Sequence, residues 1–174
     1  GLPATGILPS EVKKLASTEM KMLRSALGMH LWKMRYCQIT DHDIRRRNHV
    51  VPFGTYVSYL KAKLFAHAMR LPVTDVRRAA LCGRFIFRTE HESYYQFANA
   101  LEMPGTANAS ACGRRVLKNV VDWIVSSCGV PECAIHSIFS NSRPEGKKLV
   151  YEITREAYIR ETLTDWGKGN DEWK

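Results

Sequence analysis

The chain has 174 residues, 45% of them apolar, and a formal net charge of +9. This length fits one domain or two small ones, and the apolar fraction is sufficient for a buried core. The sequence contains no run of about 18 apolar residues, which excludes a membrane-spanning helix, and it shows no signal peptide.

The first predicted elements are an extended arm and a long helix. Residues 1–9 are rich in Gly and Pro and lead into a basic helical region over residues 10–103. Ser10 is a suitable N-cap for the first helix. Apolar residues then recur at helical spacings, which predicts one helix over 11–36 that Gly28 can bend. The residues of its apolar face are Leu15, Leu23, Leu27, Leu31 and Met34.

Three further helices are expected before residue 83. Thr40 can cap a short helix while Asp43 reaches back from the third helical position, a shortened capping box, and arginines fill the last turn. A third helix is predicted over 55–70 because apolar residues recur there and Pro72 stops it. A fourth is predicted over 74–82.

The rest of the chain is predicted to mix helices with a small β element. A loop at 103–110 is the best internal boundary, and it separates the basic region from a second helical region over 111–166 and a polar tail at 167–174. The elements predicted after residue 83 are a strand at 84–88, helices at 93–102 and 111–128, a short element at 134–139, a strand at 147–154 and a helix at 155–166. We therefore expect one compact, mainly α domain with a small β element in its C-terminal half.

The positive charge is concentrated in the first half of the chain. Residues 1–88 hold sixteen Lys/Arg against five Asp/Glu, whereas residues 89–174 hold ten against twelve. Such an asymmetry indicates a directed contact with a polyanion, because a uniformly basic surface would serve solubility equally well. Nucleic acid is the leading candidate for that polyanion.

The third predicted helix carries a stripe of basic and aromatic side chains beside its apolar face. Basic groups neutralise phosphates and release counterions, while Tyr and His rings stack on unpaired bases. The alternative is that the tyrosines are half-buried edge residues of the core and the charges only solvate the helix. The predicted nucleic-acid-binding residues, including basic residues upstream of this helix, are Lys33, Arg35, Arg45, Arg46, Tyr56, Tyr59, Lys63, His67 and Arg70.

The cysteines indicate a reducing compartment rather than a metal site. The five cysteines are odd in number and irregularly spaced, as expected of an intracellular, organellar or viral protein. Cys112, Cys128, Cys133 and His136 offer four ligands, but their spacing matches no common zinc signature. Cys112 and Cys128 also lie about 24 Å apart if one continuous helix carries both. We therefore predict no cofactor, and metal binding by these residues stays open.

The sequence favours a protein without catalytic activity. It contains no nucleophile elbow, no zinc-protease motif and no Gly-rich phosphate loop. Asp41 and Asp43 are candidate Mg²⁺ ligands of a nuclease, although helix capping explains them with fewer assumptions.

Two short motifs between Met22 and Leu81 carry a family resemblance. The first consists of Ile39-Thr40 followed by Ile44-Arg45-Arg46, and the second is Lys63-Leu64-Phe65-Ala66-His67-Ala68-Met69-Arg70-Leu71-Pro72. Together with the basic helix before them, they resemble the region that follows the polymerase core in reverse transcriptases of non-LTR retrotransposons. The resemblance implies a role in gripping template RNA or target DNA. The Tyr-x-Asp-Asp signature of the polymerase is absent, so the resemblance does not extend to polymerase activity.

These observations predict a non-catalytic protein that binds nucleic acid, RNA rather than DNA, through phosphate contacts of its basic half. An alternative is a structural subunit of a large assembly such as a ribonucleoprotein, whose tryptophans anchor it to protein neighbours. A second alternative is the metal-dependent nuclease. A membrane partner is not expected.

Overall fold

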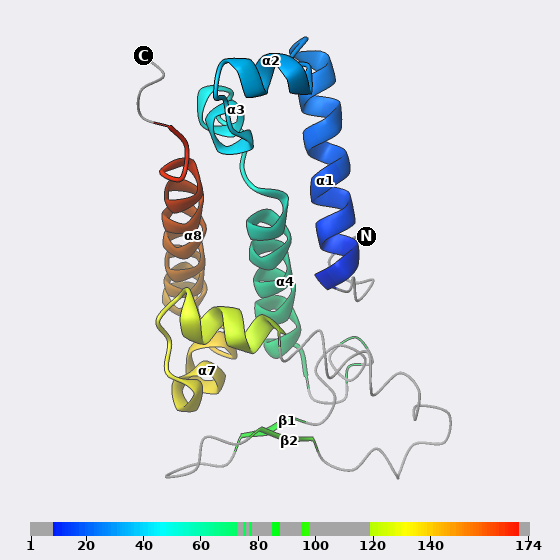
Figure 1. Ribbon diagram of the computed structural model, residues 1–174. Coiled ribbons are helices and arrows are strands. Elements are labelled where there is room, and N and C mark those ends of the chain that lie inside the picture. The colour runs from blue at the N-terminus through cyan, green and yellow to red at the C-terminus, as the bar shows by residue number, and fades with distance from the viewer. Residues whose placement is uncertain are drawn as a thin grey trace, which may run out of the picture. The chain divides into compact units, whose positions relative to one another are not determined.

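The computed structural model describes residues 9–72, 75, 77, 85–87, 95–97 and 119–170 (Figure 1). The described part is mainly helical, which confirms the predicted fold class at that level. Its helices are α1 (Pro9–Ala26), α2 (Leu31–Tyr36), α3 (Asp41–Arg47), α4 (Phe53–Met69), α7 (Glu132–Phe139) and α8 (Pro144–Trp166), and residues 119–126 are also helical. Within the described ranges, no helix is long and apolar enough to cross a lipid bilayer.

The chain forms two compact units, and each combines segments that are distant in sequence. The terminal unit contains the described residues within Leu8–Val57 and Tyr158–Lys174, and the central unit contains those within Ser58–Ala157. Helices α4 and α8 contribute residues to both units.

The long helix predicted over 11–36 is in fact two helices. Helix α1 begins at Pro9 rather than after a cap at Ser10, and proline suits a first helical position because its missing N–H has no helical partner there. Gly28 ends the helix in a left-handed conformation with φ +61°. The Met29 amide donates to the Arg24 carbonyl at 2.8 Å, and the Gly28 amide donates to Ser25 at 3.1 Å. This is a Schellman ending, and it turns the chain into α2.

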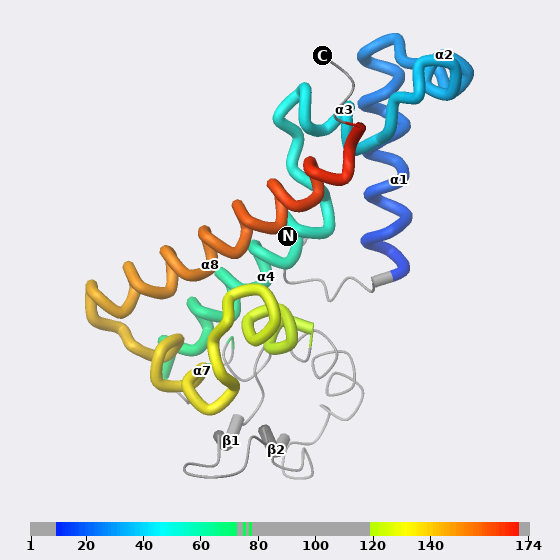
Figure 2. The backbone as a smooth tube through the Cα atoms, turned by 60° about the vertical axis from the view of Figure 1, so that its left-hand side comes forward, coloured from blue at the N-terminus to red at the C-terminus, as the bar shows by residue number. Residues whose placement is uncertain are grey.

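The same ending closes α2 and α3, with residues other than glycine in the left-handed position. Gln38 has φ +53° and His49 has φ +52°. The Ile39 amide donates to the Met34 carbonyl at 2.8 Å, and the Val50 amide donates to Arg45 at 2.9 Å. Three successive Schellman endings therefore fold α1, α2 and α3 back on one another, and Figures 1 and 2 show α2 beside the C-terminal end of α1.

The break at Gly28 changes which residues form the core of the terminal unit. Its buried cluster consists of Met20, Met34, Ile39 and Ile44, with Leu23, Met29 and Cys37 packed against it. The predicted stripe is wrong for Leu15, Leu27 and Leu31, which are 40%, 41% and 56% exposed. For Leu31 the reason is that a stripe extrapolated through a left-handed residue loses its helical phase, because the second helix starts with its own orientation.

The core of the central unit is centred on two phenylalanines. Phe65 of α4 and Phe139 of α7 have ring centroids 5.6 Å apart, and both are fully buried. Ile124 and Ile135 are buried in the same cluster. The predicted helix over 55–70 is confirmed as α4.

The strand predicted at 147–154 is wrong, because α8 runs through it from Pro144 to Trp166. Val150 and Thr154 favour strands by propensity, yet here they are buried one helical turn apart, and the Thr154 hydroxyl donates to the Val150 carbonyl at 2.8 Å. Burial of one helical face overrides local β propensity. The small β element expected in the C-terminal half is therefore not confirmed.

Two three-residue strands lie in the middle of the chain. β1 (Phe85–Phe87) pairs antiparallel with β2 (Tyr95–Phe97), and Phe85 is opposite Phe97. β1 falls within the strand predicted at 84–88, while β2 replaces part of the helix predicted at 93–102. The following predictions lie outside the described residues: the arm at 1–8, most of the helix at 74–82, the boundary at 103–110, the helix start at 111–118 and the tail end at 171–174.

Candidate nucleic-acid interface

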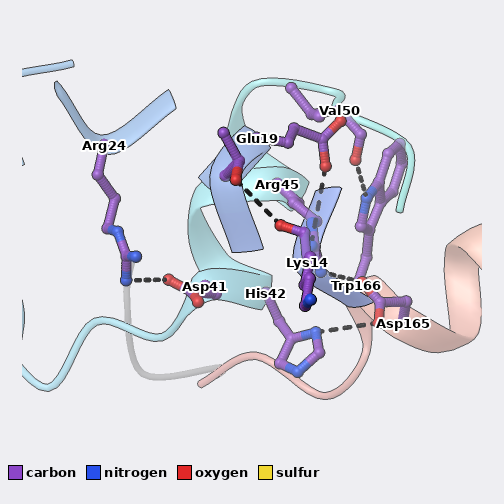
Figure 3. Close-up of polar contacts among 10 residues, drawn as sticks. Lys14, Glu19, Arg24, Asp41, His42, Arg45, Val50, Asp165 and Trp166 are labelled. Carbon is purple, nitrogen blue, oxygen red and sulfur yellow. Dashed lines mark hydrogen bonds and ion pairs between the residues drawn. The ribbon is translucent and has the colours of Figure 1, made fainter. Parts of the chain in front are cut away.

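Four carboxylates of the terminal unit pair with arginines, namely Glu19, Asp41, Asp43 and Asp165, and Figure 3 shows three of them. Arg45 of α3 lies between two of them, 3.6 Å from Asp165 of α8 and 4.0 Å from Glu19 of α1. Burial raises the pKa of Glu19, and the charge of Arg45 opposes that shift without cancelling it. Arg24 donates to the Asp41 carboxylate at 3.2 Å. These pairs hold α1, α3 and the end of α8 together.

Asp43 is the most constrained of these carboxylates. Its side chain is fully buried, and it accepts from the Thr40 amide at 2.7 Å and from the Thr40 hydroxyl at 2.6 Å. The Asp43 amide donates back to the Thr40 hydroxyl at 3.2 Å, so the predicted capping box is confirmed. Burial acts to raise the pKa of Asp43, but the bonds from Thr40 and Asn170 and the charge of Arg46 outweigh it and hold the pKa below its usual value.

The end of α8 and the residues after it close the terminal unit over α3. The Trp166 indole donates to the Val50 carbonyl at 3.1 Å, and its ring meets His49 edge-on at 5.8 Å between centroids. The Asn170 side chain donates to the Gln38 carbonyl at 2.6 Å, while Arg46 donates to the Asn170 carbonyl at 2.8 Å. The described part of the polar tail is therefore docked.

The predicted binding residues do not share one environment. The terminal unit holds Lys33, Arg35, Arg45, Arg46 and Tyr56, and the central unit holds Tyr59, Lys63, His67 and Arg70. Arg45 and Arg46 have side chains only 11% and 30% exposed, and both face internal carboxylates. Their charges are therefore already compensated within the protein.

The four residues in the central unit differ in exposure. Lys63 and His67 are exposed on α4, and the Lys63 ammonium lies 5.3 Å from the centre of the half-buried Tyr59 ring, a cation–π contact. Arg70 follows the end of α4 and is partly buried, and burial lowers its pKa.

Among the residues that the structure describes, the exposed cations of α1 and α2 form no such pair with a carboxylate. Residues 9–36 contain six Lys/Arg against two Glu, and of these Arg24 and Glu19 form the inward pairs. Exposed carboxylate charge on these helices is confined to Glu11. We name the remaining exposed cations the α1–α2 cationic surface; they are Lys13, Lys14, Lys21, Lys33 and Arg35.

Helix α2 also exposes two large aromatic rings. Trp32 is 69% exposed and Tyr36 is 85% exposed, whereas Met34 between them is 6% exposed. Sequence reasoning missed both rings because it assigned Leu31 and Met34 to one apolar stripe. The signal present in the sequence is Gly28, which can end a helix. With the break at Gly28, α2 is a separate short helix with one buried residue, and Trp32 and Tyr36 face outward.

Asp41 and Asp43, the candidate ligands of a nuclease metal, have other partners. Asp41 pairs with Arg24, and Asp43 forms the capping box of α3. Across the described ranges, no group of three or more His, Cys, Asp or Glu residues is arranged to hold a metal ion. Cys133 is exposed and Cys128 is partly buried, while Cys112 lies outside the described residues.

Comparison of the chain with protein-family models, curated proteins and solved structures gives no match. The resemblance to the retrotransposon reverse transcriptases stays a prediction.

Proposed function

We propose that this protein is a non-catalytic nucleic-acid-binding protein, with RNA as its preferred ligand, and that it binds through the α1–α2 cationic surface. The observation that carries the proposal is the division of charge in the terminal unit. The carboxylates Glu19, Asp41 and Asp43 pair with arginines inside the unit. The five surface cations are left facing solvent, where phosphates can approach them.

The arrangement of the two helices supports a shared contact surface. Met20 of α1 and Met34 of α2 are buried in the same cluster, so both helices turn their remaining sides outward. Lys14 and Lys21 are seven residues apart, about two helical turns, and therefore lie on one face of α1. Lys33 and Arg35, both in the predicted set, extend the charge onto α2.

Phosphate contacts of this kind make binding strongly dependent on salt. A single-stranded ligand that contacts all five cations releases their counterions, which gives a slope of about −3.5 for log affinity against log salt. Raising salt from about 50 to 200 mM is then expected to weaken binding about a hundredfold. Fluorescence anisotropy with a labelled RNA oligonucleotide measures this slope directly, and a DNA oligonucleotide of the same sequence tests the preference for RNA.

A flat salt dependence over that range would contradict phosphate recognition. Tighter binding to the DNA oligonucleotide at every salt concentration would overturn the assignment of RNA while leaving the cationic surface in place.

A structural subunit of a larger assembly is the second candidate function. Met22 and Leu31, 69% and 56% exposed, favour it because exposed apolar groups are typical of protein interfaces. An isolated binding module is expected to stay monodisperse in sedimentation velocity, whereas a scaffold subunit is expected to aggregate without its neighbours.

A further inference from the structure

We propose that α2 recognises unpaired bases, which stack on Trp32 and Tyr36, so that the ligand of the α1–α2 cationic surface is single-stranded. This inference rests on the proposed nucleic-acid binding and adds the class of ligand. In this mechanism bases stack on the two rings, and the cations contact the phosphates.

The geometry of α2 follows from its one buried residue. At about 100° per residue, positions two before and two after Met34 both lie about 160° from it, on the far side of the helix. Those positions are Trp32 and Tyr36, and their high exposure agrees with this orientation. Lys33 and Arg35 fall about 100° to either side of Met34, so one cation flanks each edge of the aromatic face.

The two rings are also close enough to act together. Residues four apart on a helix are neighbours, with Cβ atoms about 5–6 Å apart. Trp32 and Tyr36 can therefore present adjacent ring faces to successive bases while Lys33 and Arg35 reach the phosphates that connect them. Aromatic platforms beside basic groups are the usual means of holding single strands without sequence preference.

A duplex does not fit this surface equally well. Bases in a double helix already stack on one another and their faces are covered, so duplex RNA is recognised by its shape and backbone. The lysines of α1 can still contact a duplex backbone, but the two rings then gain no stacking partner. The aromatic pair is thus expected to discriminate in favour of single strands.

The experiment compares oligouridine of about 12 nucleotides with an RNA duplex of similar length, in fluorescence anisotropy with the full chain. The double variant Trp32→Ala/Tyr36→Ala is expected to lose at least about tenfold in affinity for oligouridine, with little change for the duplex. Trp32→Phe/Tyr36→Phe keeps two rings and is expected to retain most of the affinity. Tyr151→Ala removes an exposed ring of α8, outside the predicted binding residues, and serves as the matched control, with affinity unchanged.

The outcomes separate this inference from the proposed function. If the alanine variant binds oligouridine as tightly as the parent chain while salt still weakens binding, stacking is wrong and phosphate recognition stands. If Tyr151→Ala loses as much affinity as the double variant, the loss is not specific to the rings of α2 and the stacking site is wrongly assigned. If the parent chain binds neither RNA and α2 mediates association with protein, both proposals fail. Thermal melting checks that the variants are folded, as their exposed positions lead us to expect.

Discussion

Replacing Lys21, Lys33 and Arg35 together with glutamate is expected to weaken RNA binding about a hundredfold at 0.1 M salt. Each phosphate contact on a single strand contributes about 0.7 to the slope of log affinity against log salt. Three contacts therefore account for about two log units of the affinity that is gained when salt falls from about 1 M to 0.1 M, and the variant loses this gain. The three glutamates add repulsion beyond that loss. All three positions are exposed, so the free energy of unfolding is expected to change little.

A matched charge reversal on α8 provides the control for net charge. Lys147, Lys148 and Arg155 are exposed, and replacing them with glutamate changes the formal charge of the chain by the same amount. This second triple variant is expected to bind RNA with nearly the parent affinity, measured by the same anisotropy titration. Equal losses in the two triple variants would show that total charge, and not the α1–α2 cationic surface, determines binding.

Asp43→Ala is expected to lower the free energy of unfolding by about 3 kcal/mol, since it removes a cap and leaves buried donors without an acceptor. The Thr40 amide and hydroxyl lose acceptors at 2.7 and 2.6 Å, and Arg46 loses a carboxylate at 3.3 Å. Urea denaturation measures the loss. Asp41→Ala is the neighbouring control: its side chain is 40% exposed and pairs with Arg24, so a loss of about 0.5 kcal/mol is expected.

The pH dependence of stability gives the same site a second readout. Because the pKa of Asp43 is lower in the folded chain than its usual value, the carboxylate stabilises the fold above that usual value. The stabilisation is lost as the pH falls through the lower, folded pKa. Asp43→Asn is therefore expected to flatten the acid limb of the stability curve. An unchanged acid limb in that variant would show that other groups cause the acid sensitivity.

Local signals in the sequence predicted the parts of the fold that depend on neighbouring residues. Thr40 and Asp43 predicted the capping box because both partners lie within one turn of α3. The start of α2 was missed because apolar residues continue on both sides of Gly28. The left-handed backbone of Gly28 ends the first helix there and changes the helical phase. The strand predicted around Val150 is wrong because the segment is compatible with both a strand and a helix pattern. Burial against distant parts of the chain decides for the helix, and a short window of sequence does not show that burial.

Prediction of the site was limited in a similar way. Lys33 and Arg35 follow from charge alone, and both remain in the proposed surface. The inward pairing of Arg45 depends on Asp165, far away in the sequence, and no local pattern reveals it. Trp32 and Tyr36 are unremarkable in a stripe that continues through Gly28, and they become notable only once α2 is a separate helix with one buried residue.

Ultraviolet cross-linking of the full chain to oligouridine, followed by peptide mass spectrometry, tests the location of the RNA contact most directly. Nucleotide adducts are expected on the peptide that contains Trp32 and Tyr36, and competition with unlabelled single-stranded RNA is expected to remove them. Adducts confined to α4, at Tyr56 and Tyr59, would contradict the assignment of the contact to α1 and α2.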